Sequence, residues 1–323
     1  MDLFSLVITT PLGYLIELIY KMVQNYGLAI ILFTIIIKLI LLPLTIKSQK
    51  SMKKQQKLQP VLAELQKKYA NDQQKLQTEM MKLYKDNDVS MAGGCLPLFI
   101  QMPILIGLYQ VIQKPISFLI RADFNSEAAI NKVIEIQRLM TERFPEKIGK
   151  LSTSSMEQLA NTAQIQLSEW SKTLFGENDA WSLNFNFLGM NLSSTPSTAI
   201  SQLLSGNFSD ISTLSLLLIP ALAVFTTWVS MKLSQAQTQS KTDKKDGKEL
   251  DSAAQMNKSM NLMMPIMTLF CTITFPSGLG LYWIISNVMQ IAQQFAINKY
   301  FDDKEDEISV KVPERSNKKR KKH

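Results

Sequence analysis

Apolar residues along the chain are gathered into long blocks rather than mixed with polar residues at short range. Residues 28–46 read LAIILFTIIIKLILLPLTI, whereas residues 241–251 read KTDKKDGKELD. Such apolar blocks match the roughly 17–25 residues that a helix needs to cross about 30 Å of hydrocarbon. The pattern predicts an all-α polytopic membrane protein with five transmembrane helices, at 27–46, 94–120, 211–231, 260–276 and 279–297.

The short spacer between the last two predicted helices, Pro-Ser-Gly at 276–278, leaves room only for a tight turn. We therefore expect these helices to form a hairpin; a single long helix broken at this point is the alternative. The rest of the chain divides into an amphipathic segment on the outer side (1–26), a cytoplasmic helical hairpin (47–92), an extracytoplasmic insertion with its linker (121–210), a cytoplasmic loop (232–259) and a basic tail (298–323).

The sides of the membrane follow from the charges of these segments. Residues 47–92 carry ten basic and five acidic residues, and residues 231–259 carry six basic and four acidic residues. Residues 298–323 carry nine basic and six acidic residues. Residues 121–212 instead carry seven basic and ten acidic residues. Because cytoplasmic loops carry an excess of Lys and Arg, we expect the three basic segments and the C-terminus inside, and the N-terminus and the acidic segment outside.

Local patterns predict helices in the segments outside the spans. Residues 11–24 carry an apolar helical face that suits a helix lying in the outer interface, and a frayed extension of the first span is the alternative. Apolar residues at three-four spacing predict two helices within 47–92, the second capped by Asn71-Asp72; Pro60 either starts the first helix or kinks it. This hairpin either only covers its own apolar stripe or serves as a docking arm.

The acidic segment on the outer side is too long for a simple loop. Residues 127–144 and 154–174 are predicted to be helical, whereas residues 192–212, rich in Ser, Thr and Asn, are predicted to be a linker. We expect a small external subdomain and find no catalytic pattern within it.

Lys38 is the most informative single residue, because it falls near the middle of the first predicted span. A lysine at the bilayer centre costs on the order of 3 kcal/mol, and none of the five predicted spans contains an Asp or Glu to neutralise it. A hydrated polar cavity that opens to the cytoplasm explains such a residue best. Snorkelling of the side chain toward the inner headgroups is the alternative.

Further polar residues in the predicted spans could line the same cavity. Asn287, Gln290 and Gln294 share one face of the last span, whereas Gln101 and Gln110 lie on opposite faces of the second, so at most one of the two can join them. Thr226, Thr227 and Ser230 lie on the third span. For any single Asn or Gln, ordinary hydrogen bonding between helices is the better explanation, whereas the whole set together with Lys38 favours the cavity.

The composition excludes several classes of protein. Of 323 residues, 46% are hydrophobic, the formal net charge is +8, and there are one His and two Cys, so we expect no metal site and no cofactor. No nucleotide-binding loop, nucleophile elbow or intramembrane acid is present, which argues against an enzyme and a proton-coupled transporter. The basic run at the C-terminus could orient the protein, bind anionic lipid or contact ribosomal RNA; it comprises Lys318, Lys319, Arg320, Lys321 and Lys322.

Several stretches of the sequence resemble the YidC/oxidase-assembly/Alb insertase family. The resemblance covers about 1–120 and 183–300, and its most specific blocks are GCLPLFIQMPILIGLYQVI (94–112) and FPSGLGLYWIISNVMQIAQQ (275–294). The stretch PLGYLIELIYKMVQNYGLAIILFTIIIKLILLPLTIKS (11–48) is similar to the start of the family, and NFLGMNL (186–192) and PALAVFTTWVSMKLS (220–234) are similar to it more weakly.

The resemblance implies five core helices around a hydrophilic groove that is open to the cytoplasm and to lipid. It places Lys38 in that groove, at a position where the family usually has Arg. The positive charge is therefore kept, but the planar guanidinium group, which can make two parallel hydrogen bonds, is lost. A second departure is Met231, where Gln is common. The resemblance also implies that Thr34, Met102, Leu105, Tyr282 and Trp283 meet the substrate; with Gln101, Thr226, Asn287 and Gln290 these residues complete the expected groove.

Together these observations predict a multi-pass insertase of the bacterial plasma (inner) membrane that inserts and helps fold newly made proteins. Its expected partners are nascent membrane proteins and the lipid bilayer, with the ribosome and the Sec translocase as further candidates; no DNA and no small-molecule substrate are expected. Two alternatives from other classes stay open: a small-anion channel or transporter that uses Lys38 as its binding charge, and a membrane assembly scaffold that moves no chain segments.

Overall fold

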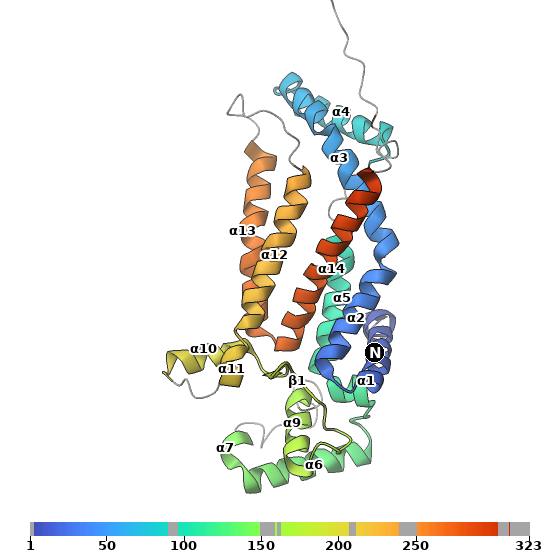
Figure 1. Ribbon diagram of the computed structural model, residues 1–323. Coiled ribbons are helices and arrows are strands. Elements are labelled where there is room, and N and C mark those ends of the chain that lie inside the picture. Colours follow the sequence, from blue (N-terminus) through green and yellow to red (C-terminus); the bar gives the residue numbers. More distant parts are fainter. Residues whose placement is uncertain are drawn as a thin grey trace, which may run out of the picture. The chain divides into compact units, whose positions relative to one another are not determined.

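Most of the computed structural model is helical (Figure 1). It describes residues 3–89, 96–148, 159, 163–206, 211–238, 251–302 and 310. The Cα positions divide the chain into two units. The first unit comprises residues 1–40, 99–228 and 263–289, and the second comprises residues 41–98, 229–262 and 290–323. The two units are described separately below.

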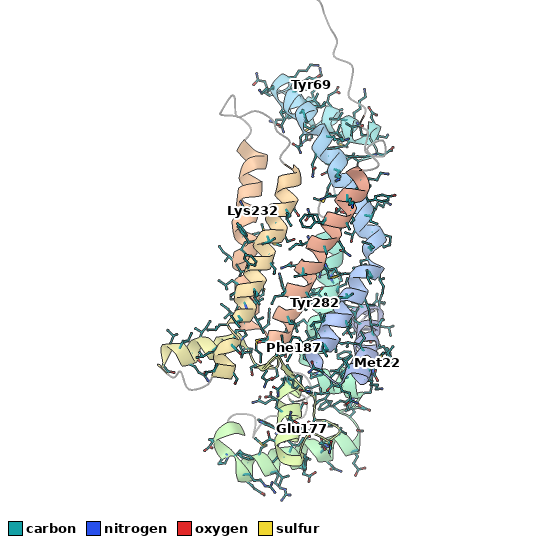
Figure 2. The ribbon with its side chains drawn as sticks, viewed as in Figure 1. Met22, Tyr69, Glu177, Phe187, Lys232 and Tyr282 are labelled. Atoms are coloured by element: carbon teal, nitrogen blue, oxygen red, sulfur yellow. The ribbon has the colours of Figure 1, made fainter. Side chains whose placement is uncertain are left out.

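The first unit begins with η1 (Ser5–Thr9), α1 (Thr10–Val23) and α2 (Tyr26–Ile40), followed by α5 (Leu96–Gln113) and η2 (Ile116–Ile120). α1 turns into α2 through Gln24, whose left-handed backbone (φ 48°) ends the helix. The buried face of α1, at Ile16 and Ile19, packs in one apolar cluster with Ile30 of α2 and Leu108 of α5. The opposite face of α1 is exposed, and Figure 2 shows Met22 on this outer surface, where it is 78% exposed.

The inserted segment after η2 forms the small helical subdomain that the sequence predicts. α6 (Glu127–Arg143) and α9 (Gln164–Phe175) pack against each other and enclose an apolar cluster that also contains Ile116 of η2 and Trp181, and the short α7 (Pro145–Ile148) follows α6 (Figure 1). Ser126 caps α6 by accepting a hydrogen bond from the Ala129 N–H. α6 matches the predicted helix at 127–144. α9 begins at Gln164 rather than at 154, and residues 154–158 lie outside the described part of the chain.

A polar cluster around Asp179 fastens this subdomain. The Asp179 carboxylate accepts hydrogen bonds from Lys132 Nζ (2.5 Å), Ser171 Oγ (2.6 Å) and the Trp181 N–H (2.9 Å). Burial alone would raise the pKa of Asp179, but these hydrogen bonds and the charge of Lys132 hold the pKa below its ordinary value. The ionised carboxylate therefore ties α6, α9 and the loop after α9 together.

Replacing Asp179 by Ala is expected to destabilise this subdomain by roughly 1.5–3 kcal/mol, because charged hydrogen-bond partners lose their acceptor. Because the folded-state pKa is depressed, this stabilisation is fully present above the unfolded value of about 3.9 and is lost as the pH falls through the lower folded value. The fluorescence of Trp170 and Trp181 on acidification would measure this loss. Glu142→Gln, which removes only an exposed pair with Arg138, should leave the transition unchanged.

A short hairpin joins the subdomain to the first helices. β1 (Asn186–Phe187) pairs antiparallel with β2 (Met190–Asn191), and the two turn residues, Leu188 and Gly189, both have positive φ (50° and 79°), as such tight hairpins require. Phe187 lies so close to Gly27 of α2 that a Cβ at Gly27 would come within 2.4 Å of the ring. The Tyr26 N–H also donates to the Asn184 carbonyl (3.0 Å).

The predicted linker at 192–212 is wrong in part, because it contains a helix. α10 (Pro196–Leu204) begins with Pro196 at its first turn, where a missing N–H costs nothing, and buries Ala199. Ser, Thr and Gln on its other positions gave the segment the composition of a linker. The short α11 (Ile211–Ser215) follows, and α12 (Leu218–Thr238) comes next.

The last two helices are α13 (Asp251–Thr274) and α14 (Ser277–Asp302), and only Phe275 and Pro276 separate them. This is the tight turn that the Pro-Ser-Gly stretch predicts. The turn is anchored to the residues after β2: the Ser277 N–H and Oγ both donate to the Ser194 carbonyl (2.9 and 2.7 Å), and the Gly278 N–H donates to the Leu192 carbonyl (3.0 Å).

In the second unit, α3 (Leu42–Lys68) and α4 (Gln73–Asp86) form the predicted helical hairpin, and they lie side by side in Figure 1. Leu58, Leu62, Leu83 and Val89 form its buried apolar cluster. Asp72 caps α4 by accepting a hydrogen bond from the Lys75 N–H (3.0 Å), as its position predicts. Pro60 lies in the interior of α3 and does not start a helix, so that alternative is wrong.

Two stretches among the described residues are long and apolar enough to cross a membrane, Ser5–Val23 and Ile211–Ser234. The pair α2 and α3 would give a third if counted as one broken span, and Met263–Thr274 is a shorter apolar helix. The first stretch includes the helix that we expected to lie in the outer interface. The number of five spans stays a prediction.

Candidate functional site

Lys38 lies in the last turn of α2, two residues before the helix ends at Ile40. The helix is interrupted at Leu41 because Pro43 has no N–H to donate to the carbonyl of Leu39. Carbonyl groups at a helix C-terminus carry partial negative charge, so this position favours a cation. The sequence placed Lys38 well inside a longer helix that ended at residue 46, whereas the fold places it beside a helix end.

Lys38 also has a polar neighbour on another helix. Its Nζ donates a hydrogen bond to Gln101 Oε1 on α5 (3.3 Å), and Gln101 Nε2 donates to the Tyr282 hydroxyl on α14. Tyr282 is 2% exposed, and Figure 2 shows it on α14. Gln101 uses its amide oxygen toward the cation and its amide N–H toward the phenol. The Tyr282 hydroxyl thus orients the Gln101 amide, and this neutral amide orients the lysine.

The fold decides between the two glutamines of α5. Gln101 joins Lys38, whereas Gln110, on the opposite face, accepts a hydrogen bond from Thr9 Oγ1 (2.9 Å). Ser286, which the sequence analysis did not single out, hydrogen bonds to the hydroxyl of Tyr282. Its spacing of four residues from Tyr282 on α14 is the one sequence signal that could have found it.

Asn287 belongs to a second polar cluster. Its Nδ2 donates to Thr227 Oγ1 (2.8 Å) and to Thr226 Oγ1 (3.1 Å), which ties α14 to α12. Thr226 also donates to the Leu222 carbonyl of its own helix (2.8 Å). For these residues the structure shows the ordinary hydrogen bonding between helices that the sequence analysis kept as an alternative.

The other predicted groove residues have varied surroundings. Thr34 is fully buried and donates to the Ile30 carbonyl of its own helix (2.7 Å). Met102 is 44% exposed, Gln290 is exposed, and Leu105 and Trp283 are partly buried. Gln294 donates to Ser234 Oγ (3.3 Å) within the second unit. The basic run at 318–322 lies outside the described residues.

Comparison with known proteins adds independent information. The sequence profile of the 60Kd inner membrane protein family matches residues 18–305. A protein named membrane protein insertase YidC from Clostridium perfringens (strain 13 / Type A) is 30% identical over 297 residues, which are 92% of this chain and 88% of that protein. A protein of the same name from Pelobacter propionicus (strain DSM 2379 / NBRC 103807 / OttBd1) is 30% identical over 92% of this chain and 39% of its own length.

Another relative is more similar over a shorter stretch. The membrane protein insertase YidC of Nitratidesulfovibrio vulgaris (strain DP4) is 51% identical over 109 residues, which are 34% of this chain and 20% of that protein. The chain therefore spans well under two thirds of the Nitratidesulfovibrio and Pelobacter proteins, but most of the Clostridium protein.

Proposed function

Because the chain belongs to the 60Kd inner membrane protein family, we propose that it is a membrane protein insertase that receives newly made membrane proteins and releases their apolar segments into the bilayer. Relatives that carry this name in other bacteria align with 92% of the chain. The observation that supports the proposal most is Lys38, a cation held among apolar helices by the amide of Gln101.

The proposed mechanism follows from the cost of moving charge through hydrocarbon. An acidic residue at the bilayer centre costs about 2.5–3.5 kcal/mol on insertion scales, which opposes the transfer of a polar segment across the membrane. A hydrated groove that contains the positive charge of Lys38 lowers this cost over part of the thickness. The apolar segment of the substrate then leaves sideways into lipid, driven by hydrophobic partitioning.

Five spans with the N-terminus outside and the C-terminus in the cytoplasm complete the proposal, in agreement with the charge of the segments. The groove includes Lys38, Gln101 and Tyr282 as its polar centre, and Met102 on the exposed face of α5 as a contact for apolar substrate. Energy comes from partitioning, from charge attraction and from the membrane potential, at about 2.3 kcal/mol per charge per 100 mV. Nascent chains and the bilayer are the proposed partners, together with the ribosome and the Sec translocase.

Site-specific photocrosslinking tests this function. A photoreactive residue replaces Met102, Thr34 or Tyr282, and a ribosome-stalled nascent chain presents one short membrane segment. We expect crosslinks to the nascent chain from Met102, and from Thr34 and Tyr282 if the groove opens to them. A probe at Ile134, an exposed residue of α6 in the inserted subdomain, is the control and should give none.

Two results would contradict the proposal. The absence of crosslinks at all three positions, together with saturable anion flux in liposomes, would favour a transporter that uses Lys38 as a binding charge. Crosslinks that form only to segments already inserted would favour a scaffold.

A further inference from the structure

Three charged side chains meet near the end of α1 that leads into α2. The Glu17 carboxylate accepts hydrogen bonds from Lys21 Nζ (2.7 Å) and from Arg121 Nε (2.6 Å). Arg121 comes directly after η2, and its left-handed backbone (φ 60°) ends that helix. Two positive groups therefore share a single carboxylate, and the cluster keeps one positive charge that the carboxylate does not neutralise.

Among the described residues, no other acid takes up this excess charge. Lys21 and Arg121 each have Glu17 as their only ion-pair partner in the described part of the chain. Asp123, two residues after Arg121, instead accepts a hydrogen bond from the Asn125 N–H of its own turn (2.9 Å). An acidic ligand from outside the chain would complete the neutralisation.

The Arg121 guanidinium has more donors than Glu17 uses. Only its Nε has a hydrogen-bond acceptor among the described residues, and Nη2 is also shielded from solvent. The guanidinium carbon lies 3.6 Å from the centre of the Tyr14 ring, and Tyr14 is 60% exposed, so this ring can turn and uncover Nη2. A guanidinium with unused N–H groups binds phosphate through parallel hydrogen bonds, and the exposed ammonium of Lys21 adds a second charge.

The surface beside this cluster is apolar. Leu18 is 61% exposed and Met22 is 78% exposed, and Figure 2 shows Met22 on the outer surface of the unit. Apart from Lys21, every exposed residue from 3 to 23 is apolar or aromatic. The stretch Ser5–Val23 is long and apolar enough to cross a membrane. Ionised groups are costly within hydrocarbon, so the charged end of α1 belongs among the headgroups whether the helix crosses the membrane or lies along it.

We propose that Lys21 and Arg121 bind the phosphate of an anionic phospholipid such as phosphatidylglycerol, whose acyl chains cover the apolar side of α1. Charge complementarity favours this occupant, because the cluster has one excess positive charge and such a headgroup has one negative charge. A zwitterionic headgroup also offers a phosphate, but Lys21 repels its ammonium group. Lipid binding here is independent of the insertase function, because it requires only that the chain is embedded in a membrane.

Lipid photocrosslinking tests the proposal at this position. Benzoylphenylalanine replaces Leu18, which lies one helical turn from both Tyr14 and Lys21. The full-length protein is placed in vesicles of equal parts phosphatidylglycerol and phosphatidylcholine with identical acyl chains, and mass spectrometry counts the adducts of each lipid. We expect phosphatidylglycerol adducts to predominate, and Lys21→Gln should lower their ratio to phosphatidylcholine adducts about fivefold, the effect of one basic residue at an anionic surface.

Matched controls separate this site from the general charge of the protein. Arg138→Gln makes the same charge change at an exposed residue of α6 and should leave the ratio at Leu18 unchanged. A probe at Leu222, an exposed residue of α12 in a stretch (215–229) without any charged residue, should give a lower ratio that Lys21→Gln does not alter.

Glu17→Gln distinguishes lipid binding from a purely structural role of the two cations. It leaves both cations without their carboxylate, so the ratio should rise. Lys21→Gln keeps the pair of Glu17 with Arg121 and therefore decides the outcome even if Glu17→Gln does not fold. Equal adducts of the two lipids, or a ratio that Lys21→Gln leaves unchanged, would overturn the proposal. So would a ratio that inorganic phosphate abolishes and sodium chloride of equal ionic strength does not, because the site would then take the free ion.

Discussion

Lys38→Glu is expected to abolish membrane insertion, and Lys38→Arg is expected to retain it. The glutamate removes the positive charge beside Gln101 and Tyr282. When it is ionised it repels the acidic part of a substrate, and when burial keeps it protonated it offers no attraction. Arginine keeps the charge and reaches Gln101 with a longer side chain. Insertion of a short single-span substrate into vesicles, measured by protease protection, would show the difference.

The controls separate the charge from its orientation and from general damage. Lys67→Glu makes the same charge change at an exposed position near the end of α3 and should insert the substrate as well as the wild type does. Gln101→Leu removes the acceptor of Lys38 but keeps the charge, so we expect an intermediate loss. If Lys38→Ala inserts every substrate as fast as the wild type, the role of the charge is refuted.

Gly280→Leu is expected to destabilise the packing of α14 against α12. Gly280 lies in the first turns of α14, where a Cβ would come within 2.4 Å of Ile219 Cγ2 on α12, and Ile219 is 2% exposed and cannot move aside. Small residues let helices approach closely in membranes, where packing rather than hydrophobic exclusion holds helices together. Overpacking of this kind lowers the free energy of unfolding by roughly 1–3 kcal/mol.

Thermal unfolding in detergent would measure this loss as a lower midpoint, and insertion should fall in parallel. Ala221→Leu adds the same side chain at an exposed position on α12 and is the matched control. An unchanged midpoint for Gly280→Leu would mean that α12 and α14 do not rely on this close contact.

Several elements of the fold were predictable because they depend on residues near each other in sequence. The hairpin of α3 and α4 follows from apolar spacing and from the cap at Asp72, and the short turn between α13 and α14 follows from the Pro-Ser-Gly stretch. The small helical subdomain after η2 was also predictable, because its helices carry their own apolar faces. α10 was missed because a helix with one buried face and many hydroxyl side chains resembles a linker in composition.

The candidate site was predictable in its central residue but not in its partners. Lys38 is conspicuous in the sequence because a charge in an apolar block is costly. Its contact with Gln101 rather than Gln110 depends on how α5 is rotated against α2, and the pairing of Asn287 with Thr226 and Thr227 depends on how α14 packs on α12. Rotations of whole helices are set by contacts between residues far apart in the chain.

By itself, the sequence determined that this chain is helical, that apolar blocks alternate with basic segments, and that one lysine lies within the first block. These properties depend only on residues that are close together in the sequence. The tertiary structure alone decided that Lys38 donates to Gln101, and that Phe301 packs with Leu42 and Ile46 of α3. These contacts join residues that are 63 positions apart in the first case. Only the packing of complete helices brings such residues within hydrogen-bond or van der Waals distance.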